Sequence, residues 1–554
     1  MFIRDIFYLY EKVNSLQTVL KFALKSQPDL QFQQKYGTQG DLFLKIIQKE
    51  LQNFTSDPEW VKAKALSDRI RAQNQGPSVG KLSESLNNLS AANPKRQFST
   101  SVFLSQKENN ENKKIFLSES IPTNKFSRIF HYTSLAADVS LSAALSGVQE
   151  VYKGNKPNVK SLIFTEDNIK KIAKKFRRMR GAALKIGQML SFQDEKVLPN
   201  DLFKILQKVQ SESYIIPRQH FDKQMIKEFN GNKKWDSELY KSFEKMPIAS
   251  ASIGQVHFAK LQDGKDVAVK VQFPGVKECI DSDLNSMVMF LTASSLLPKG
   301  LFLNKTIENA RTELAWECDY NREAECIDKF GKLLKNDTVF SVPKVYKNLT
   351  TEMVLTMDKM NGVEIMSYAE SASQEWKDWV CTEIMRLCLQ EIAEFRYMQT
   401  DPNWANFLYN KDAKKIELID FGATREFSSE FINNYRFLLT AATVNDREMC
   451  HEYSKKSGYL LGLESQQMVD AHVDSVMVLG EPFAQPGLYD FKNQTVTDRI
   501  RGNIGVMINE RLTPPPEETY SLHRKFSGVF LLCAKLGAKV PCHDLFQKHF
   551  AIKK

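Results

Sequence analysis

TDPNWANFLY, residues 400–409, and LIDFGATREF, residues 418–427, decide the fold of this 554-residue chain. In the first stretch Asp401 precedes Asn406 by five positions, and in the second the triplet Asp-Phe-Gly begins at Asp420. Both stretches alternate apolar and polar residues in the manner of short strands. Carboxylate and carboxamide oxygens at these positions can hold a divalent metal against phosphate oxygens. The order and spacing are specific together, whereas Asp-Phe-Gly alone would be a weak signal.

The spacing is that of the catalytic loop and the metal-binding triplet of protein kinases. In that arrangement Asp401 accepts the proton of the attacking nucleophile, while Asn406 and Asp420 hold Mg²⁺ beside the nucleotide phosphates. Strand-like patterns come first along the chain and helical patterns follow from Gln374 onward, the order of a bilobal kinase-like fold. We therefore expect ATP and Mg²⁺ as cofactors.

A β-hairpin is predicted over residues 256–271, where apolar and polar residues alternate on either side of a turn at Gly264. Its second strand contains VAVK at residues 267–270, which matches the kinase strand whose lysine neutralises phosphate charge. A lone strand lysine would usually be solvated. The motifs downstream favour Lys270 as a catalytic, nucleotide-binding residue. A further strand-like stretch covers residues 351–357.

The segment ASASIGQV, residues 249–256, stands where a kinase has its glycine-rich phosphate loop. Two of the expected glycines are alanines, whose Cβ atoms restrict positive φ and crowd a close approach of phosphate to the backbone. We therefore expect the nucleotide to sit differently from that in a protein kinase. The positions predicted to line it are Ala249, Ala251, Ser252, Gly254 and Val256.

The nucleotide lysine needs a buried carboxylate partner, which kinases supply from a helix after the lysine strand. The best candidate is Glu317, in the triplet Glu317-Cys318-Asp319, and Glu313 is the competitor. We expect Glu317 to position Lys270.

Two parts of a protein kinase are missing from the sequence. The residues after 427 run directly into a helical pattern, with neither an Ala-Pro-Glu motif nor an activation loop of usual length. Met398, Gln399 and Thr400 precede Asp401, where a kinase has His-Arg. Protein kinase activity and regulation by loop phosphorylation are therefore not expected.

Together these features resemble the UbiB family of atypical kinases, in its eukaryotic coenzyme Q branch, from about Arg180 to the C-terminus. The family's alanine-rich loop usually has three consecutive alanines, and here Ser250 replaces the middle one. The motifs that carry the resemblance are KIGQ at 185–188, ASASIGQVH at 249–257, the triplet at 317–319, TDPNWANF at 400–407, DFGATREF at 420–427 and PPPEETYSLHRK at 514–525.

The resemblance implies an α+β, bilobal protein-kinase-like fold, with a β-rich N-lobe, a helical C-lobe and an added N-terminal helical extension. We expect a presequence-like, poorly ordered region at 1–100 and the helical extension at 101–240. The N-lobe is expected at 241–365 and the C-lobe at 366–554.

The resemblance also implies that the KxGQ residues Lys185, Gly187 and Gln188 fold over the active site. Lys185 would there meet the acids Glu317 and Asp319 and block the space of a protein substrate. Family membership implies ATPase activity that supports ubiquinone biosynthesis on the matrix face of the inner mitochondrial membrane. The implied partners are a complex of biosynthetic enzymes and hydrophobic quinone precursors; a homodimer is left open, and nucleic acid is not expected.

An amphipathic helix is predicted over residues 169–190, because apolar residues recur there at spacings of three and four. Its other faces are basic, which favours an anionic membrane surface as a partner, although a solvated charged face is an equal alternative. The stretch at 126–148 is apolar but includes Arg128, His131 and Asp138, so we expect a buried or interfacial helix rather than a membrane span. The basic residues are Lys170, Lys171, Lys174, Lys175, Arg177, Arg178 and Arg180.

Composition suits a globular protein, with 42% hydrophobic and 26% charged residues, and the net charge of +10 is only a mild bias toward anionic partners. Eight cysteines without a CxxC pair argue against a zinc ribbon or a disulfide framework. RQFSTS at 96–101 resembles a mitochondrial presequence cleavage site, although the many acids among the first 68 residues argue against import.

The leading hypothesis is an ATPase in which Asp401 orients water. A small-molecule or lipid kinase is the alternative, because Asp401 could equally take a proton from a substrate hydroxyl. A nonenzymatic nucleotide-binding scaffold is the third hypothesis, and the retention of every phosphate and metal residue argues against it.

Overall fold

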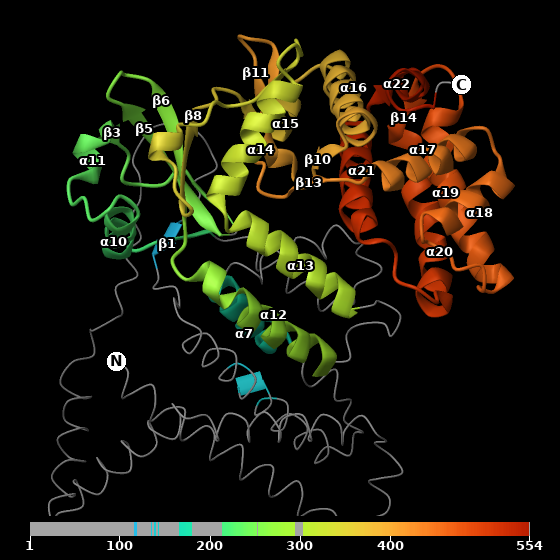
Figure 1. Ribbon diagram of the computed structural model, residues 1–554, viewed down its shortest axis with the longest axis horizontal. Helices are drawn as coiled ribbons and strands as arrows, with labels where there is room; N and C mark the ends of the chain where they lie inside the picture. The colour runs from blue at the N-terminus through green and yellow to red at the C-terminus, as the bar shows by residue number, and fades with distance from the viewer. Residues whose placement is uncertain are drawn as a thin grey trace, which may run out of the picture.

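This computed structural model describes residues 165–179, 213–251, 253–293 and 303–552, together with residues 116–118, 135, 138, 139 and 142. A sheet-containing lobe lies at one side of the molecule and a helical lobe at the other (Figure 1). The expected β-rich N-lobe and helical C-lobe are confirmed. The boundaries of the four expected regions stay a prediction, since most of the first 212 residues lie outside the described part.

The N-lobe sheet is antiparallel and has the order β3-β5-β6-β8, with β4 paired to β5. The predicted hairpin is confirmed as β5 and β6, with Val256 opposite Lys270 and Gly264 at φ +90° in the turn. Valine side chains on β6 are fully buried, which fixes the register of the strand that holds Lys270. The strands are β3 (Tyr240–Phe243), β4 (Ala249–Ser250), β5 (Gly254–Leu261), β6 (Asp266–Gln272) and β8 (Val354–Asp358).

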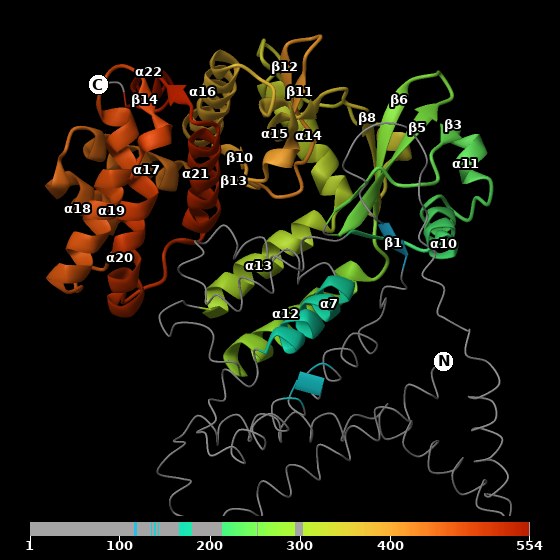
Figure 2. The same cartoon turned by 180° about the vertical axis from the view of Figure 1, so that it is seen from behind.

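Between β6 and β8 the described residues include the α-helices α12, α13 and α14, and α14 packs against the sheet. Helix α7 lies alongside α12 in both views (Figures 1 and 2). The remaining elements on this side of the chain are α7 (Glu166–Met179), β1 (Phe116–Ser118), β2 (Ser213–Ile215), α10 (Arg218–Glu228), α11 (Trp235–Glu238), α12 (Val276–Ala293), α13 (Leu303–Glu317) and α14 (Tyr320–Leu333).

Helices dominate the C-lobe, which also contains three small sheets: β10-β13, β7-β12-β11-β9 and β14-β15. The helices are α15 (Ile365–Ala369), α16 (Gln374–Gln390), α17 (Ser429–Thr443), α18 (Arg447–Lys456), α19 (Gln466–Ala484), α20 (Val496–Glu510), α21 (Glu517–Leu536) and α22 (Cys542–His549). The strands are β7 (Phe340–Ser341), β9 (Val363–Glu364), β10 (Tyr397–Gln399), β11 (Phe407–Asn410), β12 (Lys415–Leu418), β13 (Thr424–Glu426), β14 (Tyr489–Asp490) and β15 (Lys539–Val540).

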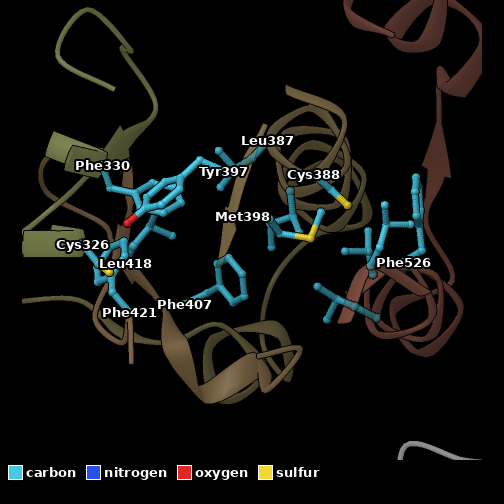
Figure 3. Close-up of a cluster of buried hydrophobic side chains, with 14 of the residues drawn as sticks. Cys326, Phe330, Leu387, Cys388, Tyr397, Met398, Phe407, Leu418, Phe421 and Phe526 are labelled. Atoms are coloured by element: carbon cyan, nitrogen blue, oxygen red, sulfur yellow. The ribbon is translucent and has the colours of Figure 1, made fainter. Parts of the chain in front are cut away.

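A buried cluster joins the two lobes around Phe421 of the Asp-Phe-Gly triplet (Figure 3). The ring centroid of Phe421 lies 5.0 Å from that of Phe330 on α14, which in turn lies 5.4 Å from Tyr397 on β10. Phe526 of α21 and Cys388 of α16 extend the cluster into the C-lobe. Apolar packing therefore connects the Asp-Phe-Gly triplet to α14, α16 and α21.

The predicted amphipathic helix is α7, described up to Met179, and the remainder of the predicted range lies outside the described residues. Ile169 and Ile172 are buried, whereas Lys170, Lys171 and Lys174 are exposed. Within the described residues, no helix combines the length and apolar character that crossing a bilayer requires.

A hydrogen-bonded chain fixes the tautomer of His257 in the N-lobe. The backbone N–H of Ile216 donates to Oε1 of Gln255 (2.9 Å), so the amide Nε2 of Gln255 donates to Nε2 of His257 (2.8 Å). Nδ1 of His257 donates to the carbonyl oxygen of Glu244 (2.8 Å). Burial lowers the pKa of His257 to about 4, because the charged imidazolium loses its solvation there. Protonating Nε2 would in addition place a donor against the amide donor of Gln255.

We predict that His257 makes folding less stable in acid. On unfolding, the pKa of this side chain rises toward 6.5, so the unfolded chain takes up the proton at a higher pH than the folded protein does. The contribution of the neutral side chain to the free energy of unfolding is therefore lost as the pH falls from about 6.5 toward 4. Between pH 7 and pH 4.5 the loss should be about 2–3 kcal/mol of unfolding free energy. Denaturant unfolding of wild type and His257→Gln measures it: the variant should lose less stability over this range. Equal losses in both proteins would contradict the prediction.

Candidate functional site

Lys270 of β6 lies at the centre of the candidate active site. Its Nζ donates to Oε1 of Glu323 at 2.6 Å and lies 3.6 Å from Oδ1 of Asp420. Oε1 of Glu323 also accepts the backbone N–H of Phe421 at 3.2 Å. The predicted nucleotide lysine and the predicted metal aspartate therefore meet at one place, between the sheet and the Asp-Phe-Gly triplet.

Charge balance keeps the lysine protonated in this buried position. Burial alone would lower the pKa of Lys270, but the negative charges of Asp420 and Glu323 outweigh it and raise this pKa above its ordinary value. Burial raises the pKa of the Glu323 carboxyl, against the opposing effect of Lys270. The Glu323 side chain is 2% exposed and that of Asp420 37%, so Asp420 is the carboxylate that faces an incoming ligand.

The prediction that Glu317 pairs with Lys270 is wrong, because the structure gives that place to Glu323. Glu317 is the last residue of α13, and the helix ends there, with two residues between it and Tyr320, where α14 begins. Asp319 is the N-cap of α14 and accepts the backbone N–H of Arg322 at 3.1 Å. A signal for this break was present, since Asp is a preferred N-cap and Glu323 falls in the helical turn that follows.

Glu317 lies instead beside the metal-binding triplet. A Cβ added to Gly422 would be 3.4 Å from Cγ of Glu317. The KxGQ residues expected to meet Glu317 and Asp319, namely Lys185, Gly187 and Gln188, lie outside the described residues, so this part of the site stays a prediction.

The catalytic loop brings Asp401 and Asn406 together as the spacing predicted. Nδ2 of Asn406 donates to Oδ2 of Asp401 at 3.1 Å, and the N–H of Asn403 donates to Oδ1 of Asp401 at 3.2 Å. The amide nitrogen of Asn406 is thus engaged, and its Oδ1 is the atom left for a metal. A one-turn 3₁₀ helix at Trp404–Asn406 sets this side-chain geometry.

Asp420 and Asn406 suit Mg²⁺. Oδ1 of Asp420 accepts the N–H of Gly422 at 3.1 Å, while its Oδ2 makes no hydrogen bond within the described part of the chain. Mg²⁺ is typically held by one or two carboxylates together with substrate phosphates and water. The observed donor set is of that kind, and a bound metal there would neutralise phosphate charge.

The alanine-rich loop differs from a glycine-rich loop in a way its backbone explains. Ala249 pairs with Val256, and the N–H of Ala251 donates to the carbonyl of Gly254 at 2.8 Å. Neither alanine has a positive φ, so neither position needs glycine. Gly254 does, because an added Cβ would lie 2.6 Å from the oxygen of Val271. Ser252 lies outside the described residues.

Arg322 of α14 is a residue that sequence reasoning missed. Its guanidinium donates to the carbonyl of Gly422 (3.0 Å) and to that of Thr424, and it stacks over Trp316 with 4.5 Å between its Cζ and the ring centroid. Arg322 therefore fastens the segment after Asp-Phe-Gly to α14. No local sequence motif predicts this contact, because its partners lie about a hundred residues apart in the sequence.

The segment after the triplet is short, as predicted. Met398 of β10 pairs with Arg425 of β13, and α17 begins at Ser429, immediately after its N-cap Ser428. The chain therefore passes from the metal-binding triplet to the C-lobe helices without an activation loop.

Comparisons with known proteins identify the family of this chain. A family model described as the ABC1 atypical kinase-like domain matches residues 208–454. The "Atypical kinase COQ8, mitochondrial" of Saccharomyces cerevisiae is 60% identical over 450 residues, which cover 81% of this chain and 89% of the yeast protein. The protein of the same name from Schizosaccharomyces pombe is 45% identical over 466 residues, covering 83% of this chain and 75% of that one.

A solved Mycobacterium tuberculosis structure, titled as the complex of Rv3197 with erythromycin, is 23% identical and has a TM-score of 0.49, covering 70% of this chain and 96% of that one. The family match and the two fungal relatives confirm the resemblance that the motifs suggested. This chain belongs to the ABC1, or UbiB, family of atypical kinases, in the branch of the mitochondrial COQ8 proteins.

Proposed function

We propose that this protein is a mitochondrial ATPase that supports coenzyme Q biosynthesis. The observation that carries the proposal is the assembled set of Lys270, Glu323 and Asp420 beside a catalytic loop, with no activation segment on which a protein substrate could dock. Relatives from Saccharomyces cerevisiae and Schizosaccharomyces pombe that are 60% and 45% identical to this chain are both named as the mitochondrial atypical kinase COQ8. Transfer to water needs positioning and charge stabilisation, which these residues supply.

In the proposed reaction Lys270, held by Glu323, neutralises phosphate charge on ATP. Asn406 and Asp420 would hold Mg²⁺, which when bound supplies further charge neutralisation. Asp401 orients a water molecule, whose oxygen forms a bond to the γ-phosphorus while the bond to the β-phosphate oxygen breaks. The water's proton passes to the Asp401 carboxylate, and ADP and phosphate leave.

The proposed partners are an anionic surface of the inner mitochondrial membrane on its matrix face, hydrophobic quinone precursors and a complex of biosynthetic enzymes. Support for the surface comes from α7, whose Ile169 and Ile172 are buried while Lys170, Lys171 and Lys174 face outward. Clustered lysines on an amphipathic helix suit anionic lipid headgroups.

Phosphate release tests the proposal. We expect the purified full chain to release phosphate from ATP in the presence of Mg²⁺, faster with anionic liposomes than without, and Asp420→Asn to abolish the release. Radiolabel from γ-labelled ATP that appeared in an extracted lipid would instead support a lipid kinase. No turnover above the mutant in any condition, with ATP still bound, would favour a nucleotide-binding scaffold.

We predict that Asp401→Asn lowers kcat by about 10²-fold or more while ATP affinity changes little, because a positioned proton acceptor contributes about that much. The substitution keeps the size of the side chain, and its one remaining oxygen can accept the hydrogen bond from Nδ2 of Asn406. Steady-state turnover and nucleotide titration measure the two quantities. Unchanged turnover would remove Asp401 from the mechanism.

We predict that Glu323→Gln weakens ATP binding, because Lys270 loses the carboxylate that holds it. A tenfold weaker affinity would remove about 1.4 kcal/mol of the stabilisation that saturating ATP gives. Thermal unfolding with and without Mg-ATP measures the difference. Glu317→Gln is the matched comparison, since Lys270 does not pair with Glu317, and a larger loss in that variant would restore the partner assigned from sequence.

A further inference from the structure

One face of α21 lies against the catalytic loop, although more than a hundred residues separate the two in the sequence. Arg524, Lys525 and Gly528 form this face, and each contacts a different residue between 399 and 404. Figures 1 and 2 show α21 below α16 and beside β10 and β13, the strands that flank the loop and the Asp-Phe-Gly triplet. Residues at positions i, i+1 and i+4 of a helix can share one side, so a single rigid element makes all three contacts.

Arg524 ties the loop to α13. Its Nη2 donates to both carboxylate oxygens of Glu313, at 2.8 and 2.9 Å, and to Oγ1 of Thr400 at 3.3 Å. Its Nε donates to the carbonyl of Thr400 at 3.4 Å. The side chains of Arg524 and Glu313 are 9% and 4% exposed. Thr400 immediately precedes Asp401, so the guanidinium fixes the backbone next to the proposed catalytic carboxylate.

The charge of Arg524 is balanced although the side chain is buried. Burial would lower the pKa of this guanidinium, but Glu313, followed by Asp401 and Glu317, raises it. Removing one partner of such a pair leaves an uncompensated buried charge. The Thr400 hydroxyl also donates to the carbonyl of Ala423 at 2.6 Å. Thr400 therefore links Arg524 to the residue that follows the Asp-Phe-Gly triplet.

Lys525 contacts Gln399, the residue before Thr400. Its Nζ donates to the backbone carbonyl of Gln399 at 2.7 Å and to the side-chain Oε1 of Gln399 at 2.8 Å. The same Nζ lies 3.6 Å from Oε2 of Glu391, whose Oε1 accepts the N–H of Gln399 at 3.0 Å. Lys525 and Glu391 are 2% and 1% exposed in their side chains. A buried ion pair therefore fixes the strand that enters the loop.

Gly528 sets how closely α21 approaches. A Cβ added there would lie 2.2 Å from Cβ of Pro402, which follows Asp401, and a proline ring has little freedom to move aside. The carbonyl of Gly528 also accepts Nε1–H of Trp404 at 3.1 Å. Glycine in mid-helix is unfavourable relative to alanine by about 1 kcal/mol. The close contact with the loop gives a physical reason for a glycine at this point.

We propose that α21 positions the catalytic loop, with Arg524, Lys525 and Gly528 as positioning residues for Asp401 and Asn406. In a protein kinase an arginine before the catalytic aspartate and the activation loop help to order this region. This chain has Thr400 in place of that arginine and no activation loop. The ordering cation, Arg524, comes instead from α21 and reaches Thr400 from outside the loop.

Where turnover is measured, this proposal rests on the proposed ATPase activity. The experiment therefore also includes a measurement that does not depend on activity. Hydrogen–deuterium exchange of peptides covering residues 397–410 reports directly on the order of the catalytic loop. If the wild-type protein hydrolyses no ATP, the proposed function fails, and the exchange measurement alone decides whether α21 orders the loop.

Gly528→Ala is the first variant, because it alters no charge and removes no hydrogen-bonding group. Helix propensity alone would make it stabilising. We expect faster exchange in 397–410 and a kcat lower by about 10²-fold, the effect of a misplacement near 1 Å, with ATP affinity within about threefold of wild type. Gly502→Ala on α20 is the matched control, since a Cβ there meets nothing within 4 Å, and it should change neither exchange in the loop nor turnover.

Arg524→Lys is the second variant, because it keeps the charge but cannot reproduce the forked contacts to Glu313 and Thr400. Its matched control is Arg386→Lys, where Arg386 contacts Asp337 through two nitrogens at 2.7 and 3.2 Å, in the same lobe. We expect both to lower the melting temperature, and only Arg524→Lys to speed exchange in 397–410 and to lower kcat more than ATP affinity. Wild-type exchange in 397–410 in both Gly528→Ala and Arg524→Lys, or changes equal to those of the controls, would overturn the proposal.

Discussion

The carboxylate of Glu323 is the contact on which the two lobes of this protein depend. It accepts hydrogen bonds from the ammonium of Lys270 in the sheet and from the backbone N–H of Phe421 in the metal-binding triplet. A buried carboxylate is costly unless its charge is paired and its oxygens are hydrogen-bonded. Separating the lobes would leave that charge with fewer partners, so the same group that positions the nucleotide lysine also opposes opening of the site.

This contact is reinforced by restraints that take the place of an activation segment. Arg322 holds the carbonyls of Gly422 and Thr424 from α14, and Thr400 contacts Ala423 from the catalytic loop. The stretch after the triplet is therefore fastened from both lobes over a few residues. A protein kinase orders the corresponding region through a long segment that can be switched by phosphorylation. Here the same region is short and its restraints are built into the fold.

The sequence was informative where a function depends on local spacing. Asp401 and Asn406, five positions apart on one loop, and Lys270 on an alternating strand could be placed because their neighbours dictate their geometry. Glu323 could not be separated from Glu317 by spacing alone, since the choice depends on where one helix ends and the next begins. The contacts of α21 were beyond prediction for another reason: they join residues more than a hundred positions apart, and no periodicity encodes such a pairing.

The alanine-rich loop, predicted to line the nucleotide, shows how the surrounding structure, rather than glycine's freedom, can shape such a segment. Ala249 and Ala251 keep negative φ, and Ala249 is paired to β5 as part of a short strand. Gly254 has no space for a Cβ, because the oxygen of Val271 would lie 2.6 Å and the hydroxyl of Tyr320 2.8 Å away. Tyr320 is the first residue of α14, the helix that also carries Glu323. The alanine-rich loop and the carboxylate that holds Lys270 are thus set by the same helix, so a shift of α14 would change both at once.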